Sequence, residues 1–100
     1  MHATAMEELY EHMNDLRGNT SKREFSTNYL GASANYMTSM KNMGRDASAK
    51  AIAHLITVLE TELAACEMIH AQYSNSRTQR LLEKTTQLHV LAQKKLREMF

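Results

Sequence analysis

The chain has 100 residues, the size of one ordinary domain, and it contains no proline and only three glycines. With 43% hydrophobic residues, this composition excludes the turn-rich β-sandwiches and barrels and favours helices. The net charge is only +1, but the charges alternate in blocks, acidic over residues 1–16 and 51–76 and basic over residues 17–50 and 77–100. Each basic block has six Lys or Arg residues against two acids, so the charges bear on the choice of partner.

Three short amphipathic helices are predicted in the first part of the chain, each ended by a glycine, the residue that helices favour just after their last turn. The glycines are Gly18, Gly31 and Gly44. Ser21 with a glutamate three residues later has the spacing of a capping box, so the second helix is predicted to begin there. Ser33 is predicted to cap the third helix, over residues 33–43, whose inward stripe consists of Tyr36 and three methionines, the last of them Met43.

Two long helices are predicted in the second part of the chain. Ser48 caps a helix that runs to about residue 73, and Thr78 caps a last helix that continues to the C-terminus. Joined by a short loop, two helices of this length form an antiparallel hairpin. The predicted fold class is therefore all-α with about five helices, a head of short helices over residues 1–56 followed by a long antiparallel helical hairpin over residues 48–100. The fourth helix is shared, within a single folding unit.

The leucines of the last predicted helix form an apolar stripe that is too long for one small domain to cover. They are Leu81, Leu88, Leu91 and Leu96. We therefore expect the hairpin to pack against a second copy of the chain, most simply about a two-fold axis, with these leucines in the dimer interface. A monomeric bundle is the alternative.

Residues 21–56 have the pattern of a DNA-reading head. They run SKREFS, LGAS and YMTSM, followed by Gly44, Arg45 and Ser48 before an apolar helix. This segment resembles the Cro and phage-repressor type of helix-turn-helix, in which a small-residue turn leads through a Ser or Thr cap into the recognition helix. One extra residue lies before Gly31 and another, Met43, before Gly44, and the proline of the family's next loop is absent. The resemblance implies a small dimeric, sequence-specific DNA-binding protein, a transcriptional regulator that reads the major groove with helix 33–43.

The outward positions of that third helix have side chains suited to the edges of bases. Six residues are predicted to contact bases: Ala34, Asn35, Thr38, Ser39, Lys41 and Asn42. An asparagine can bond adenine through two hydrogen bonds, a threonine methyl can touch a thymine methyl, and a lysine can reach guanine or phosphate. Helix N-termini and the cations near them are predicted to contact phosphates. These residues are Ser21, Lys22, Arg23, Ser33, Arg45 and Lys50.

Catalytic and metal-binding functions find little support in the sequence. Glu62, Cys66 and His70 share one side of the fourth predicted helix, but one helix rarely completes a metal site, and Cys66 falls within the apolar stripe. The sequence has no Ser-His-Asp or Cys-His pattern and no glycine-rich phosphate loop. We therefore predict neither an enzyme activity nor a cofactor or metal.

The predicted partners are double-stranded DNA and a second copy of the chain, with no membrane. A single cysteine and an acidic first segment, unlike a signal peptide, predict a cytoplasmic location. The alternative function is a helical protein-interaction module, an anti-activator or regulator-binding dimer that captures another regulatory protein and binds no DNA. Charge distinguishes the two: basic blocks on a common face favour DNA, whereas basic blocks that cover the chain's own acids favour the interaction module.

Overall fold

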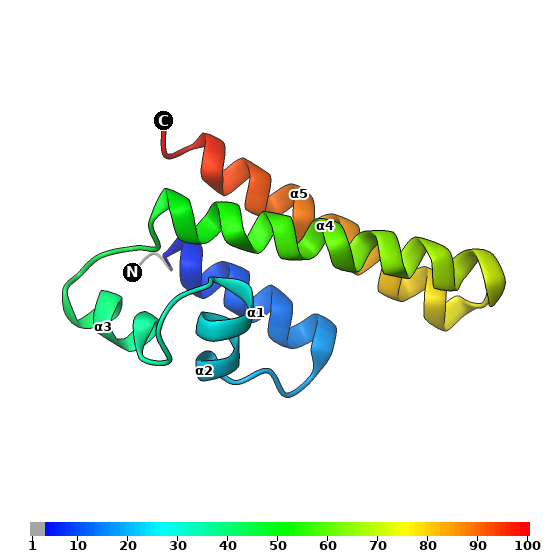
Figure 1. Ribbon diagram of the computed structural model, residues 1–100, viewed down its shortest axis with the longest axis horizontal. Coiled ribbons are helices and arrows are strands. Elements are labelled where there is room, and N and C mark those ends of the chain that lie inside the picture. Colours follow the sequence, from blue (N-terminus) through cyan, green and yellow to red (C-terminus); the bar gives the residue numbers. More distant parts are fainter. Residues whose placement is uncertain (1–3) are drawn as a thin grey trace.

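The protein is all-helical over residues 4–100, the part of the chain that the computed structural model describes, and this confirms the predicted fold class. The helices are α1 (Ala5–Arg17), α2 (Lys22–Glu24) continued by the π-helical turn η1 (Phe25–Tyr29), α3 (Tyr36–Asn42), α4 (Ala49–Gln72) and α5 (Ser76–Arg97). Figure 1 shows α4 and α5 as a long antiparallel pair, with α2 and α3 on the side of α4 away from α5. Across residues 4–100, no helix combines the length and the apolar character needed to cross a bilayer.

Side-chain caps begin the helices at two of the predicted places. The Ser21 hydroxyl oxygen accepts a hydrogen bond from the Glu24 amide at 3.1 Å, and the Ser48 hydroxyl accepts from the Ala51 amide at 3.2 Å. Each bond satisfies one of the backbone amides that the first turn of a helix leaves without a partner. The predicted starts of α2 and α4 are therefore confirmed.

Two other predicted caps are wrong. Ser33 begins a turn rather than a helix, because its carbonyl accepts the Tyr36 amide at 3.0 Å, and α3 is consequently shorter than the predicted helix 33–43. At α5 the cap is Asn75, whose side chain accepts the Thr78 amide at 2.9 Å while the Thr78 hydroxyl accepts the Asn75 amide at 3.1 Å. Thr78 is thus the third residue of a capping box and not the cap itself.

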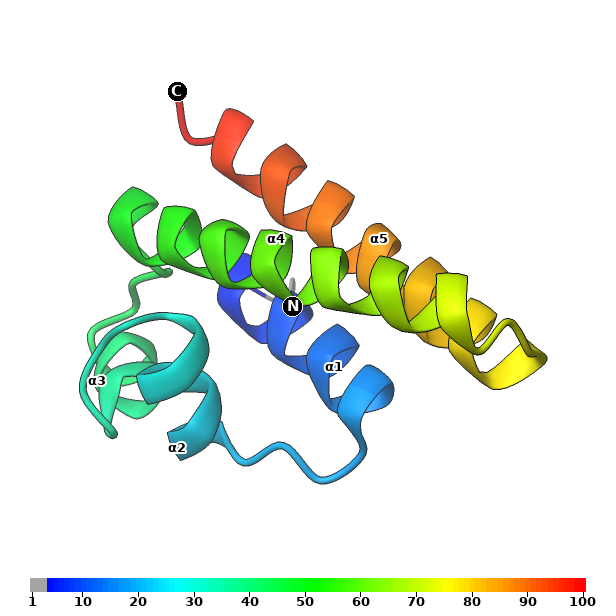
Figure 2. The ribbon, with the colours of Figure 1, turned by 45° about the vertical axis from the view of Figure 1, so that its right-hand side comes forward.

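One apolar core joins the short helices to the long hairpin. Its largest fully buried side chains are Met6, Leu9, Met13, Phe25, Ile52, Leu55, Leu59 and Leu88. These side chains come from α1, η1, α4 and α5. Figures 1 and 2 show α1 lying between the long hairpin and the short helix α2. Met43, predicted to point inward, is instead 55% exposed, because α3 ends one residue before it.

The leucine stripe of α5 is largely covered within the single chain. Leu88 is only 2% exposed, and Leu91 and Leu96 pack against the core, because α1 lies against α5 beside α4. Leu81 is half-buried. The placement of Leu88 in a dimer interface is therefore wrong: the sequence argument treated the stripe as uncovered and left out the contribution of α1.

Candidate nucleic-acid interface

The short helix α3 has one buried side and one polar, exposed side. Met37 is 4% exposed, and Tyr36 and Met40 are half-buried against the core. The predicted base-contacting residues Asn35, Thr38, Ser39, Lys41 and Asn42 are all exposed, and Ala34 is half-buried. Figure 1 shows α3 at the periphery of the molecule, beyond the start of α4. Four of the six predicted base-contacting residues thus lie on the exposed side of α3, whereas Ala34 and Asn35 precede the helix, which begins only at Tyr36.

Hydrogen bonds at both ends of α3 fix its orientation. At its beginning, the Tyr36 hydroxyl oxygen accepts the Ser48 amide at 3.0 Å, which ties α3 to the start of α4. At its end, the Arg45 amide donates to the Met40 carbonyl at 2.8 Å. A helix of this length is marginal alone, so these bonds and the buried Met37 side chain hold it in place.

The segment before α3 contains a π-helical turn. In η1 the Leu30 amide donates to the Phe25 carbonyl five residues earlier, at 3.0 Å. Such a turn contains one residue more than an α-helical turn. After α3, Met43 is exposed.

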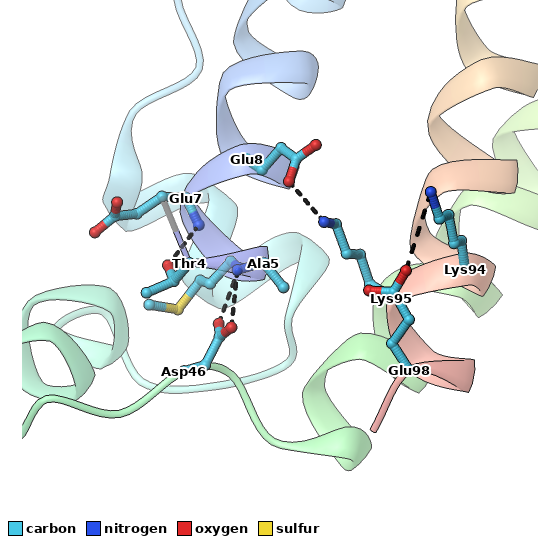
Figure 3. A network of polar contacts seen from close by, with 9 residues as sticks. Thr4, Ala5, Glu7, Glu8, Asp46, Lys94, Lys95 and Glu98 are labelled. Atoms are coloured by element: carbon cyan, nitrogen blue, oxygen red, sulfur yellow. Dashed lines mark hydrogen bonds and ion pairs between the residues drawn. The ribbon is translucent and has the colours of Figure 1, made fainter. Parts of the chain in front are cut away.

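Asp46 is a positioning residue that the sequence did not reveal. Its carboxylate oxygens accept the Ala5 and Met6 amides at 2.8 and 2.9 Å (Figure 3). They also accept the Ala47 amide at 2.7 Å. The loop after α3 is thereby attached to the N-terminus of α1, where backbone amides favour a negative charge. The contact spans about forty positions of sequence, so no local spacing predicts it.

Five cations around α2 and α3 are exposed, and none of them lies within ion-pair distance of an acidic group in residues 4–100. We call them the head cations: Lys22, Arg23, Lys41, Arg45 and Lys50. Lys22 and Lys41 line one cleft of about 270 Å³ together with Thr38 and Asn42, so predicted phosphate and base contacts meet there. Lys50 lines a different cleft, on the α4 side of Tyr36. Ser21 is engaged in capping α2, and Ser33 lies in the turn that leads into α3 without capping it.

The second basic block, by contrast, is partly neutralised by the first acidic one. Lys95 Nζ lies 2.7 Å from a Glu8 carboxylate oxygen (Figure 3), and Lys84 Nζ lies 2.8 Å from one of Asp15. The hydrogen bond from Lys95 lowers the pKa of Glu8, and the one from Lys84 lowers the pKa of Asp15. These lysines of α5 therefore hold α1 rather than forming a free positive surface.

Arg17 is also engaged within the chain and does not belong to the head cations. Its guanidinium lies 2.6 Å from a Glu62 carboxylate oxygen. Burial is the largest single influence and disfavours the charged form of Arg17, but the hydrogen bond to Glu62 and the attraction of its charge together raise the pKa of Arg17 above its usual value. The charges therefore do not decide between the two functions: two lysines of α5 pair with acids of α1, whereas the head cations make no ion pair within residues 4–100.

The residues weighed for metal binding face different partners. His70 Nδ1 lies 2.8 Å from the Thr78 hydroxyl, Cys66 is buried with its sulfur 3.9 Å from the Thr85 hydroxyl, and Glu62 pairs with Arg17. Within the described range, no group of three or more His, Cys, Asp and Glu side chains is arranged to hold a metal ion.

The fold and the surface around α3 define a small all-helical protein with an exposed, basic pair of short helices attached to a long hairpin. The chain belongs to the family of unknown function DUF6626, whose sequence profile matches residues 6–99. Neither a curated protein nor a solved structure matches the chain significantly.

Proposed function

We propose that this chain is a sequence-specific DNA-binding protein, a transcriptional regulator that reads the major groove with the exposed side of α3. The observation that carries the proposal is the set of head cations, which make no ion pair within residues 4–100, around a short helix whose exposed side is polar. Duplex DNA carries a dense row of phosphates, and unpaired Lys and Arg side chains are what it binds without respect to sequence. The resemblance of residues 21–56 to the Cro and phage-repressor helix-turn-helix supports the same function.

Base reading is assigned to the exposed side chains of α3 and to Asn35, the residue just before it. Asn35 offers two hydrogen bonds to adenine, and the methyl group of Thr38 suits a thymine. Lys41, beside Lys22 in the same cleft, reaches phosphate or guanine. The set contains no arginine and no glutamine, so most of the affinity comes from phosphates and falls steeply with salt.

The first experiment measures retardation of mixed genomic DNA fragments by the purified protein at low salt. We expect retardation whose binding constant declines linearly with salt on logarithmic axes. Replacing Lys22 and Lys41, which line one cleft, with alanine weakens binding to all fragments and reduces that slope. The matched control replaces Arg77 and Arg80, two exposed cations of α5, and leaves retardation unchanged. Absence of retardation by the unaltered protein at low salt overturns the proposal.

The second experiment tests base reading by enriching random duplexes on the protein. The double variant Asn35→Ala/Thr38→Ala retains salt-dependent binding but loses the enriched sequence, because only base contacts carry sequence information. Asn19→Ala/Thr61→Ala, at exposed positions away from α3, serves as the control and keeps the enriched sequence. An unchanged sequence preference in the α3 variant would assign the reading to another element.

We propose further that two copies of the chain act together as a dimer. The two weakly binding heads of a dimer bind a two-fold symmetric site with much greater avidity than a single head does. The alternative function, a helical interaction module, is favoured by the way α5 covers the acids of α1. The two functions differ in a simple assay: the Asn35→Ala/Thr38→Ala variant loses a DNA-dependent phenotype but captures a partner protein as before.

A further inference from the structure

A strip of exposed residues runs along α5 on the side opposite its buried face. Its members recur at steps of three and four, which places them on one side of a helix. We call it the α5 strip; it consists of Glu83, Thr86, Gln87, Val90, Lys94 and Arg97. Val90 lies at its centre and is 53% exposed, whereas Leu88 of the same helix is 2% exposed. The strip contains none of the four stripe leucines, although the half-buried Leu91 lies next to it.

A shallow, mostly apolar groove of about 410 Å³ lies over the centre of the strip. Val90 and Leu91 line it with the aliphatic parts of Thr86, Gln87 and Lys94, and His12 of α1 forms its rim. An exposed β-branched side chain in an apolar groove favours a partner that brings apolar surface of its own. The groove therefore marks a contact surface, and the charges around it identify the partner.

The charges of the strip are arranged symmetrically about Val90. Glu83 precedes Val90 by seven residues, and Arg97 follows it by seven. In an antiparallel pair of α5 helices with Val90 on a two-fold axis, Glu83 of each copy therefore faces Arg97 of the partner subunit. A parallel pair in register would place Glu83 against Glu83 and Arg97 against Arg97, which is unfavourable.

The groups that this pairing would use are free in the single chain. Neither Glu83 nor Arg97 lies within ion-pair distance of an opposite charge in residues 4–100; Glu83 accepts only a hydrogen bond from the Gln79 amide group at 3.1 Å. Thr86 and Lys94 both lie four positions from Val90, so in the same antiparallel pair Thr86 of each copy faces Lys94 of the partner subunit. The strip is thus complementary to itself in one orientation.

We propose that a second copy of the chain docks on the α5 strip, helix against antiparallel helix, with the two Val90 side chains in contact on the axis. This interface is centred on Val90 and includes the half-buried Leu91, whereas Leu88 belongs to the core of the single chain. It involves no DNA, so the free protein tests it, and its failure leaves the proposed reading by α3 untouched.

The first test follows the mass of the purified protein by sedimentation equilibrium over a concentration range of about 5 to 500 μM. We expect a reversible monomer–dimer equilibrium. Val90→Lys, which places two ammonium groups face to face on the axis, weakens the dimer by about 100-fold or more. Met68→Lys, at an equally exposed apolar position near the end of α4, is the control and leaves the dimer unchanged. Circular dichroism verifies that both variants keep their helices.

The second test exchanges charges. Glu83→Arg and Arg97→Glu each put like charges together twice in a homodimer and weaken it by about tenfold, whereas an equal mixture of the two variants meets opposite charges on both sides and forms heterodimers. The controls Glu67→Arg and Arg77→Glu, at exposed positions outside the strip, leave the dimer unchanged and gain nothing from mixing.

Three results overturn the proposal: an unaltered chain that stays monomeric throughout the concentration range, a dimer that Val90→Lys does not weaken, or charge variants that do not recover on mixing. The first of these results assigns the strip to a different partner protein. Because all the altered positions are exposed, loss of the fold does not obscure the outcome.

Discussion

At the scale of single residues, Gly31 has two separate reasons to be glycine. Its φ of +61° lies in the left-handed region, and a Cβ there would be 2.7 Å from the His54 ring. The ring cannot withdraw freely, because His54 Nδ1 is hydrogen-bonded to the Tyr29 carbonyl at 2.9 Å. The sequence predicted the helix end at Gly31 from local chemistry, but not the contact with His54, which depends on how α4 packs beside η1.

The variant Gly31→Ala is expected to destabilise the protein by about 2–3 kcal/mol, from the left-handed backbone and the close contact together. Gly44→Ala, at a φ of +67° with nothing within 4 Å, should cost only about 1 kcal/mol. Urea denaturation followed by circular dichroism measures both. In a protein that already has His54→Ala, the further change Gly31→Ala should lower the free energy of unfolding by no more than Gly44→Ala does in the unaltered protein. Equal costs for the two single glycine variants would contradict the close packing of His54 on Gly31.

At the scale of elements, Asp46 joins α1 to the loop that follows α3. Asp46→Ala leaves the Ala5 and Met6 amides without their acceptor and removes a charge from the end of α1, so we expect a loss of about 1–3 kcal/mol. Asp46→Asn keeps one acceptor oxygen and should lose less. Glu24→Ala, at an exposed carboxylate of α2, is the control for removing a negative charge near α3. Thermal and urea unfolding report the differences, and an Asp46→Ala protein as stable as the Glu24→Ala protein would show that the attachment contributes nothing.

Elements also differ in how far the sequence predicts them. The starts of α2 and α4 depend on Ser21 and Ser48, whose bonds reach only three residues along the chain, and both were predicted. The start of α5 was misplaced within the same short range, because Asn75 and Thr78 exchange bonds and either residue type can act as a cap. The coverage of Leu88 by α1 was missed entirely, because it depends on helices about seventy positions apart and no local pattern contains it.

At the scale of the whole molecule, the alternation of charge along the sequence has a partly internal explanation. Two acids of α1 meet two lysines of α5, so these pairs stabilise the arrangement of the helices, whereas the head cations make no ion pair within residues 4–100. The sequence supplied the blocks but not their pairing, since pairing requires that α1 lie against α5. The outward set on α3 was predictable because helical periodicity alone assigns its sides.

This pairing makes stability depend on pH in the acidic range. The hydrogen bond from Lys95 lowers the pKa of Glu8 below its ordinary value of 4.5, so the folded state holds its proton less tightly than the unfolded chain does. The stabilisation is complete above that ordinary value and is lost as the pH falls through the lowered pKa. Because both groups are partly exposed, the loss is under about 1 kcal/mol.

The variant Glu8→Gln should therefore show a smaller decline in its urea midpoint between pH 6 and pH 3 than the unaltered protein, and the two should converge at the acidic end. Glu11→Gln, at an exposed carboxylate of the same helix without an ion pair to a described residue, is the matched control and should follow the unaltered protein. A midpoint for Glu8→Gln that runs parallel to that of the unaltered protein at every pH would contradict the pairing.

The largest scale is the pair of molecules on DNA, where the reading side of α3 and the α5 strip act together. If two copies dock through Val90, the α3 helices of both bind one two-fold symmetric site, and the second binding event becomes intramolecular. Val90→Lys should therefore weaken binding to the full symmetric site by about 10- to 100-fold while leaving binding to an isolated half-site unchanged, since α3 is intact. Fluorescence anisotropy with both duplexes at one salt concentration measures the two affinities, with Met68→Lys as the control. An equal loss on the full site and the half-site would mean that the strip contacts DNA directly, and no loss on either would mean that each copy reads its half-site alone.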